Sequence, residues 1–219
     1  MKGQLYVVAT PIGNLEDITL RALRLLKNVS AIYCEDTRHT KLALTHWQIN
    51  KPCFSLHQHS ADTKFMEVIG YLERGQDVAY VTDAGTPGIS DPGGRLVEAV
   101  IAANLTVTPI PGPSAVITAL SASGLPSDRF LFLGFPPLKG RENFWKKVLA
   151  REEMFVFYES PHRLVKALQE LIKLAAGTRT CVVARELTKK FETFYRGTVA
   201  EVLEKLPVVI KGEIVVIIK

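Results

Sequence analysis

Hydrophobic and polar residues follow one another in two different patterns along the first half of the chain. Short apolar runs such as LYVVAT (residues 5–10) are typical of buried strands, and longer stretches whose apolar residues recur every three or four positions are typical of amphipathic helices. One such helical face is formed by Ile18, Ala22, Leu25, Leu26 and Val29. From Leu5 to Pro111 the two patterns predict a β-α-β-α-β-α-β-α-β order, and therefore a mostly parallel sheet covered by helices.

Several of these elements carry signals at their ends. Asp91 and Pro92 predict the start of a helix over GGRLVEAVIAAN, because Asp is a favoured N-cap and Pro is favoured at the first helical position. Asn104 is expected to end it, since Asn tolerates the left-handed conformation found beyond helix C-termini. The other elements expected in this half are strands at 31–36, 53–57, 78–82 and 106–111, and helices through 42–47 and about 61–74.

A second α/β lobe is predicted after a stiff connection. PIPGPS (109–114) holds three prolines in six residues, so we expect 112–114 to join an N-terminal lobe, 1–111, to a C-terminal lobe, 115–219. In the second lobe, Ser160 and Pro161 predict a helix start and Gly177 its end. CVVARE and ETFYRG lie close enough to form a hairpin, so this sheet is expected to be mixed. The remaining expected elements are helices at 115–123, 143–150 and 198–206, and strands at 130–135, 154–159 and 213–218.

Composition narrows the class of protein. The chain has 219 residues, of which 47% are hydrophobic and 22% are charged, an ordinary composition for a globular protein. No apolar run reaches the roughly 18 residues that span a bilayer, and no signal-peptide pattern opens the chain, so a cytoplasmic enzyme is expected. The three cysteines lack CxxC spacing and are expected to be buried thiols, without a metal site. A net charge of +5 favours an anionic partner, although many metabolic enzymes are equally basic.

The loops that follow the predicted strands hold most of the clustered polar residues. Ligands of open parallel sheets bind beyond the carboxyl ends of the strands, so these loops are where a site is expected. The first loop, PIGN, lacks both GKS/GKT and GxGxxG, which excludes nucleoside triphosphatases and ordinary dinucleotide-binding proteins. TDAGTPGISDPGG is more specific, since its turn glycines suit a backbone that approaches a ligand closely.

Eight segments together resemble the successive motifs of a known family. They are VATPIGNLEDITLRAL, EDTRHT, TDAGTPGISDPG, PIPGPSA, SASGLPSDRF, FYESPHR, VARELTK and KGEIVV. In this order they resemble the tetrapyrrole methylase-like superfamily, and within it the bacterial ribosomal RNA small subunit (cytidine-2′-O)-methyltransferases. One stretch departs from the family pattern: PPLKGRENFW replaces a basic run, so no RNA contact is assigned to Lys139 or Arg141.

The resemblance implies a two-lobed α/β fold with S-adenosylmethionine in a cleft between the lobes. It also implies a homodimeric cytoplasmic enzyme that methylates a cytidine ribose 2′-hydroxyl in 16S rRNA, within the small ribosomal subunit, without a metal. The residues it places around the cofactor are Ile12, Asp83, Gly85, Thr86, Ser114, Ala115, Tyr158, Ala184 and Gly212. For Asp83 the alternative is an Asx turn that stabilises its own loop.

Substrate contacts and a proton acceptor are expected in the same loops. The expected RNA contacts are Asn14, Glu35, Arg38, His39, His162, Arg163, Arg185 and Lys189. Asp36 and Glu159 are candidate general bases for the 2′-hydroxyl, and a mechanism without a base stays open. The alternatives are helix capping by Asp36 or Thr37, an ion pair between Glu159 and Arg163, and solvated charge at the basic residues.

Two other functions remain compatible with the sequence. The first is methylation of a tetrapyrrole or another small molecule by the same fold. The second, from a different class, is a non-catalytic RNA-binding or ribosome-assembly protein.

Overall fold

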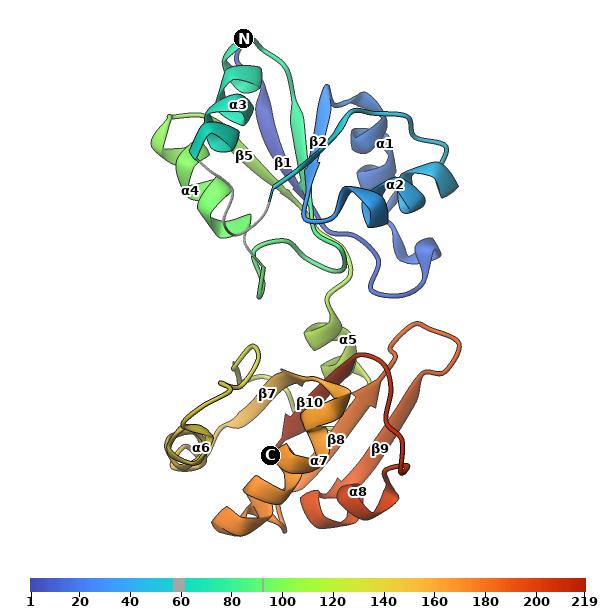
Figure 1. The fold of residues 1–219 in the computed structure, drawn as a ribbon, viewed down its shortest axis with the longest axis vertical. Coiled ribbons are helices and arrows are strands. Elements are labelled where there is room, and N and C mark those ends of the chain that lie inside the picture. The colour runs from blue at the N-terminus through green and yellow to red at the C-terminus, as the bar shows by residue number, and fades with distance from the viewer. Residues whose placement is uncertain (57–61, 92) are drawn as a thin grey trace. The chain divides into compact units, whose positions relative to one another are not determined.

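The computed structural model of the chain describes residues 1–56, 62–91 and 93–219 (Figure 1). The chain divides into two compact units, residues 1–114 and 115–219, so the predicted connection at 112–114 lies at the end of the first unit. Each unit is built around its own five-stranded sheet.

The first unit contains a sheet in which all neighbouring strands are parallel, as predicted. Its strand order is β3-β2-β4-β1-β5, and β5 is an edge strand, which explains how it accommodates Pro109. The strands are β1 (Gln4–Val8), β2 (Ala31–Cys34), β3 (Cys53–Ser55), β4 (Val78–Val81) and β5 (Thr106–Ile110). The helices are η1 (Leu15–Asp17), α1 (Leu20–Asn28), α2 (Thr37–His46), α3 (Asp62–Glu73) and α4 (Gly93–Ala102).

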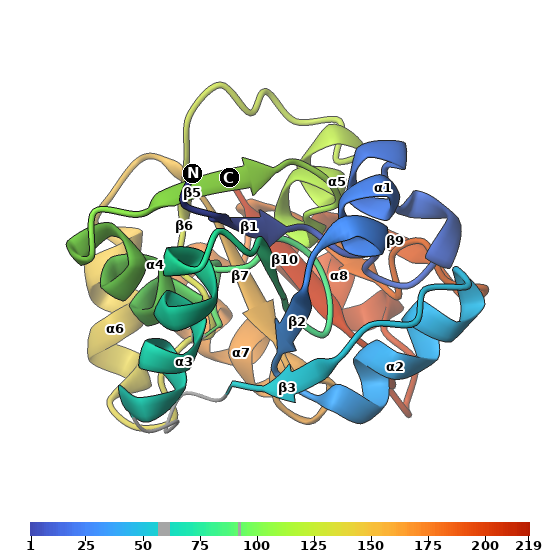
Figure 2. The ribbon, with the colours of Figure 1, turned by 90° about the horizontal axis from the view of Figure 1, so that it is seen from above.

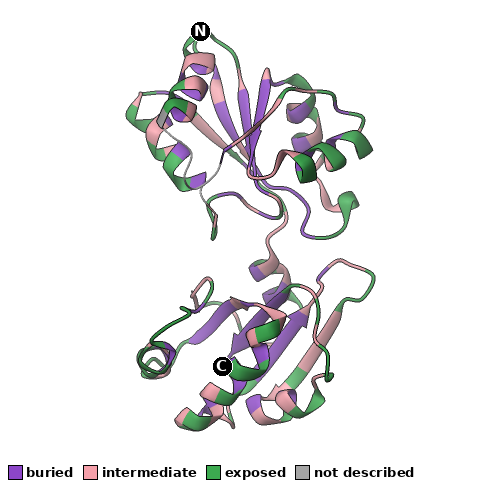
Figure 3. Ribbon diagram, in the orientation of Figure 1, coloured by how far each residue is buried: buried purple, intermediate pink, exposed green. Residues whose placement is uncertain are grey.

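Helices α1 and α2 cover one face of this sheet, and α3 and α4 cover the other (Figures 1 and 2). Successive side chains of a strand point to opposite faces, so neighbouring residues belong to different cores. Tyr6 and Ile32 pack in a cluster with Ala22 and Leu26 of α1 and Leu44 of α2. The other face packs against α3 and α4, through Leu5, Tyr33, Tyr80, Val68 and Leu96. Figure 3 shows that buried residues make up much of the strands of this sheet and recur along the helices that pack on it.

Local capping explains where these helices begin and end. Thr19 accepts a hydrogen bond from the Ala22 N–H, so α1 begins at Leu20. Ile18 was predicted on this helix but lies before its first residue. The helix expected through 42–47 begins earlier, at Thr37. Asn104 adopts a φ of 54° after α4, which confirms the predicted stop. Asp91 accepts a hydrogen bond from the Gly93 N–H at 2.7 Å at the start of α4. Pro92, predicted as the first residue of this helix, lies outside the described residues. So does Ala61, the predicted first residue of the helix over about 61–74.

The second unit contains the predicted mixed sheet, in the order β6-β7-β10-β8-β9. β6 and β7 are parallel, and the other neighbours are antiparallel, including the predicted hairpin β8–β9. The strands are β6 (Phe130–Phe132), β7 (Met154–Glu159), β8 (Thr180–Arg185), β9 (Thr193–Thr198) and β10 (Ile214–Ile218). The helices are α5 (Ala115–Ser121), α6 (Arg141–Leu149), α7 (Pro161–Leu171), η2 (Ile172–Ala176) and α8 (Val199–Lys205).

One helix of this unit stops at the predicted glycine, but without the left-handed conformation that a glycine stop usually has. Gly177 follows Ala176, the last residue of η2, and keeps a right-handed φ of −61°. The left-handed residue is Ala175, inside η2, with a φ of 62°, so the helical backbone is already interrupted before the glycine. Pro161 does occupy the first turn of α7, although Ser160 makes no side-chain cap bond there.

Two expectations from composition can be compared with the structure. All three cysteines are free thiols, and Cys34 and Cys181 are buried as expected, while Cys53 is half-buried. Among the described residues, no helix has the length and hydrophobicity needed to cross a bilayer.

Candidate functional site

The first unit has a topological switch point between β1 and β4. These strands are neighbours, but α1 leaves β1 over one face of the sheet and α4 leaves β4 over the other. Such a divergence opens a crevice at the carboxyl ends of the strands, which is where open α/β sheets bind ligands. Here the two loops are joined at their base: Thr10 and Gly85 exchange backbone hydrogen bonds of 2.9 and 3.0 Å.

Glycines let the neighbouring loops approach this point closely. Gly85 has a φ of 80°, which disfavours other residues, and a Cβ there would lie 3.4 Å from Ile12 Cγ2. A Cβ on Gly112 would lie 2.9 Å from the Cβ of Ala9. Thr86 also donates a 3.0 Å hydrogen bond to the Pro113 carbonyl. The loops after β1, β4 and β5 therefore meet at one place, as their position after parallel strands predicts.

Asp83 connects a fourth loop, the one after β2, to this group. Its Oδ1 accepts a hydrogen bond from the backbone N–H of Asp36 at 3.1 Å. The carboxylate therefore links two neighbouring loops, which differs from the Asx turn within its own loop that was the alternative. Within the described residues Asp83 Oδ2 accepts no hydrogen bond, so this oxygen stays available to a ligand.

Asp36 acts as the N-cap of α2. Its carboxylate accepts the Arg38 N–H at 2.8 Å and also forms an ion pair with the Arg38 guanidinium, with 2.8 Å between Oδ2 and Nη2. The hydrogen bonds from Arg38 hold the pKa of the Asp36 carboxyl at about 2. A carboxylate with so low a pKa accepts protons poorly at neutral pH, which argues against Asp36 as a general base.

We expect a direct titration to show this low pKa. Followed by the carboxyl carbon resonance, Asp36 should stay ionised as the pH falls from 7 to about 4, and Arg38→Gln should raise its midpoint toward the ordinary value near 3.9. Because the folded pKa is depressed, the contribution of Asp36 to stability is present above about pH 4 and is lost as the pH falls through about 2. A midpoint near neutrality would restore Asp36 as a candidate base.

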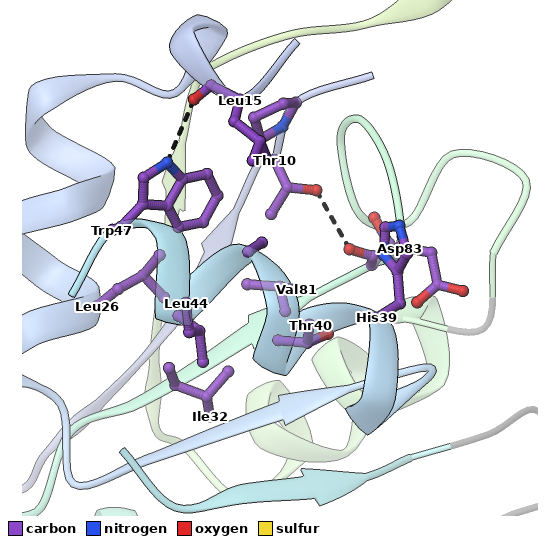
Figure 4. A pocket seen from close by; sticks show the side chains of 13 residues that line it. Thr10, Leu15, Leu26, Ile32, His39, Thr40, Leu44, Trp47, Val81 and Asp83 are labelled. Carbon is purple, nitrogen blue, oxygen red and sulfur yellow. Dashed lines mark hydrogen bonds between the residues drawn. The ribbon is translucent and has the colours of Figure 1, made fainter. Parts of the chain in front are cut away.

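A largely apolar pocket lies beside these loops, under α1 and α2 (Figure 4). His39 and Asp83 lie at one end of it, and Trp47 lies at the other, where its indole N–H donates to the Leu15 carbonyl at 3.2 Å. His39, predicted as an RNA contact, is exposed and reaches the pocket rim. The pocket floor includes Leu26, Ile32, Leu44 and Val81.

In the second unit, Glu159 is part of a buried charge network. Its side chain is fully buried and forms ion pairs with Arg141 at 3.1 Å and Arg163 at 2.9 Å. Glu159 Oε1 also accepts the Ser160 N–H at 2.8 Å, so both oxygens are engaged. Arg141 further pairs with Glu170 at 2.7 Å. The ion-pair alternative therefore describes Glu159 and Arg163, and the network argues against Glu159 as a proton acceptor.

Two predicted RNA contacts are engaged within the protein. Arg185 donates to the carbonyls of Lys211 and Phe191 at 3.0 and 3.1 Å, and so joins the β8–β9 connection to the segment before β10. Lys189 forms ion pairs of 3.0 Å with both Glu186 and Glu213. Each would have to exchange these partners to bind a phosphate, which makes them weaker candidates than the sequence indicated.

The remaining predicted residues are placed as follows. Tyr158 is half-buried, and burial raises the pKa of its hydroxyl, while Ala184 is fully buried in β8. Gly212 has a φ of 93°, and a Cβ there would collide with the Glu186 side chain. The backbone conformation and the contact with Glu186 therefore explain a glycine at this position without a ligand. Asn14 caps η1 through the Glu16 N–H. Glu35 and Ser114 are half-buried in loops, Ala115 is half-buried at the start of α5, and His162 is exposed on α7.

The structure also assigns roles to residues that sequence reasoning missed. No sequence motif assigns a role to Arg141, yet it is 7% exposed and bridges two glutamates. Trp47 and Leu15 line the pocket although they looked like ordinary helix and turn residues. The contacts join residues far apart in the sequence, so no local pattern could have revealed them.

Comparison with known proteins is consistent with this geometry. The profile of the Tetrapyrrole (Corrin/Porphyrin) Methylases matches residues 4–203. A protein of Escherichia coli O157:H7 named Ribosomal RNA small subunit methyltransferase I is 50% identical over 92% of this chain and 71% of its own length. One of the same name from Hydrogenobaculum sp. is 46% identical over 98% of this chain and 95% of its own length.

Solved structures show the same fold at much lower identity. A diphthine synthase superposes with a TM-score of 0.74 at 13% identity, covering 99% of this chain and 90% of its own. The uroporphyrin-III C-methyltransferase of Thermus thermophilus, complexed with S-adenosylhomocysteine, gives a TM-score of 0.67 at 18% identity over 98% and 97% of the two chains.

Proposed function

Because the chain belongs to the tetrapyrrole (corrin/porphyrin) methylase family, we propose that it transfers a methyl group from S-adenosylmethionine to a cytidine ribose 2′-hydroxyl of 16S ribosomal RNA. One observation carries the choice of substrate: 50% identity, over 92% of the chain, to a relative named for small-subunit ribosomal RNA. The fold alone leaves the substrate open, since proteins with very different names share it.

The residues at the switch point suit the proposed cofactor. S-adenosylmethionine supplies a methyl group on a sulfonium, together with an ammonium group and ribose hydroxyls. The free Oδ2 of Asp83 can accept a hydrogen bond from an ammonium or hydroxyl group, and the backbone at Gly85 carries no side chain that would obstruct a ligand. Ile12, Thr86 and Ser114 are proposed contacts in the same loops.

Other cofactor and substrate contacts are proposed from the family resemblance. In the second unit the proposed cofactor contacts are Ala115, Tyr158, Ala184 and Gly212. Arg38, His39 and His162 are exposed and remain our preferred RNA contacts. Asn14, Glu35 and Arg163 are further proposed RNA contacts. Arg185 and Lys189 stay in the proposal only if RNA displaces their present partners.

We propose that alignment, more than a strong base, drives the reaction. Both carboxylates considered as bases are engaged in ion pairs, and the pKa of Asp36 is about 2. Holding two reactants in line can supply roughly 7–11 kcal/mol of a barrier. The chain would thus act mainly by binding and orienting both molecules, and the 2′-hydroxyl proton would leave to solvent after or during transfer.

Labelled methyl transfer tests this proposal. With S-adenosylmethionine carrying a radioactive methyl group, small ribosomal subunits from a strain lacking the modification should incorporate label into 16S rRNA, while already modified subunits should not. Label in an added tetrapyrrole, with none in rRNA, would favour the small-molecule alternative. Calorimetry without detectable S-adenosylmethionine binding would favour a non-catalytic RNA-binding protein.

The proposal extends to the setting of the reaction. Relatives are named for the small ribosomal subunit, so we propose assembled subunits or their precursors as substrate, in the cytoplasm, with the enzyme as a homodimer. Sedimentation of the purified protein would test the dimer.

A further inference from the structure

The helices α1 and α2 carry a strongly one-sided charge. Together they hold five Lys or Arg residues and no Asp or Glu, although residues 1–114 contain more acidic than basic residues, 11 against 10. The helices on the opposite face, α3 and α4, hold two basic and four acidic residues. The five basic residues, which we call the α1–α2 basic face, are Arg21, Arg24, Lys27, Arg38 and Lys41.

All five side chains are exposed, and most have no acidic partner. Of the five, only Arg38 forms an ion pair within the described residues, with Asp36. On the other face, Lys64 of α3 is paired with Glu67 at 3.0 Å. Neighbouring unpaired cations repel one another weakly in water, and their summed potential attracts an anion to the face. The basic face is therefore arranged for an anionic partner.

The basic face is continuous with the candidate site. Both helices contribute residues to the pocket, Leu26 from α1 and His39, Thr40 and Leu44 from α2, so they lie side by side (Figures 1 and 4). α2 begins directly after the loop that Asp83 holds, and Lys41 lies one turn beyond Arg38. On α1, Arg21, Arg24 and Lys27 recur every three residues over about 9 Å of helix.

We propose that the α1–α2 basic face binds the phosphate backbone of the ribosomal RNA that flanks the methylated nucleotide. This inference rests on the proposed function and adds Arg21, Arg24, Lys27 and Lys41 to its RNA contacts. The spacing and charge suit a polyanion whose phosphates follow one another along a strand. The face would hold the RNA in register while the switch-point loops receive the target.

Packing favours RNA over a lipid surface as the partner. A helix that lies on a bilayer needs its own apolar face for the lipid. The apolar faces of α1 and α2 are already used, because Ala22, Leu26 and Leu44 are buried against the sheet. Only Leu20 and Leu42 are exposed apolar residues on these helices.

The salt dependence of RNA binding tests the proposal. The double variant Arg24→Gln, Lys27→Gln is compared with a matched control, Lys2→Gln, Arg74→Gln, which removes two exposed cations of the same unit outside α1 and α2. Binding to purified small ribosomal subunits and to a 16S rRNA transcript is measured between 50 and 300 mM salt. Each lost phosphate contact should reduce the slope of log affinity against log salt by about 0.7–0.9.

For the double variant we expect the magnitude of the slope to fall by about 1.5 and the affinity for RNA near physiological salt to fall roughly tenfold. Both values should be unchanged in the control. Its S-adenosylmethionine affinity should match that of the wild type. An unchanged slope, or an equal loss in the control, would overturn the basic face as an RNA surface. A second result would also overturn it: the wild type binds anionic phosphatidylserine vesicles, and the double variant loses this binding while its slope for RNA stays unchanged.

The two proposals fail in different ways. If the wild type transfers no methyl group to rRNA but its RNA binding still responds to the variant, the basic face stands and the enzymatic proposal fails. If methyl transfer occurs but the variant leaves both the salt slope and the KM for subunits unchanged, the enzymatic proposal stands and the basic face fails as an RNA surface.

Discussion

Replacing Arg141 by Met is expected to destabilise the second unit by about 3–5 kcal/mol, the range found when one partner of a buried ion pair is removed. Arg141 and Glu159 have side chains 8% and 0% exposed, and Arg141 also pairs with Glu170. Without the guanidinium, Glu159 would keep Arg163 but lose its other cation, and Glu170 would keep only the Trp145 indole N–H. Urea unfolding followed by far-UV circular dichroism would measure the change.

A matched control lies on the same helix. Lys146 forms an ion pair with Glu142, but both side chains are more than half exposed, so Lys146→Met should cost at most about 0.5 kcal/mol. The triple variant Arg141→Met, Glu159→Gln, Glu170→Gln should recover part of the loss, because neither carboxylate is left without the guanidinium, and the recovery is incomplete because the half-buried Arg163 loses Glu159. A cost below about 1 kcal/mol for Arg141→Met alone would contradict a buried, energetically coupled network.

Replacing Asp83 by Ala is expected to weaken S-adenosylmethionine binding by at least about tenfold, since hydrogen bonds to a charged group contribute roughly 1.5–3 kcal/mol. The change removes the proposed acceptor Oδ2 and the bond from the Asp36 N–H that joins the loops after β2 and β4. Isothermal titration calorimetry on the purified chain would measure the dissociation constant, and a melting curve would show whether the fold is retained.

Two further variants separate these effects. Asp83→Asn keeps an acceptor for the Asp36 N–H but removes the charge, so an affinity between those of wild type and Asp83→Ala would assign part of the binding to the carboxylate charge. Thr86→Val removes a neighbouring loop bond, to Pro113, without touching Asp83. An unaltered dissociation constant for Asp83→Ala would leave this residue with only its role in joining loops.

The fold was predictable because each element carries its own pattern. Apolar runs separated by amphipathic stretches predicted the parallel sheet, and the closeness of CVVARE to ETFYRG predicted the β8–β9 hairpin. Errors fell at element ends, where one backbone feature decides. Thr19 shifts the start of α1, and the left-handed Ala175 interrupts the helical backbone of η2 shortly before Gly177.

The grouping of the candidate site's loops was predictable, and the partners of its charged residues were less so. Parallel strands bring their following loops to one edge, so Ile12, Asp83 and Thr86 could be grouped from the sequence. Whether a charged side chain is free or engaged depends on residues distant in sequence. The sequence offers Glu159 as a base, yet its partner Arg141 lies 18 positions earlier, on α6, whereas Glu159 ends β7.

Nucleoside analysis of the labelled product decides whether this chain methylates a cytidine ribose of 16S rRNA. Small subunits lacking the modification are incubated with the chain and radioactive S-adenosylmethionine, and their 16S rRNA is then digested to nucleosides and separated by chromatography. We predict that the label elutes with 2′-O-methylcytidine. Label on a methylated base, or on a different ribose-methylated nucleoside, would contradict the proposed acceptor.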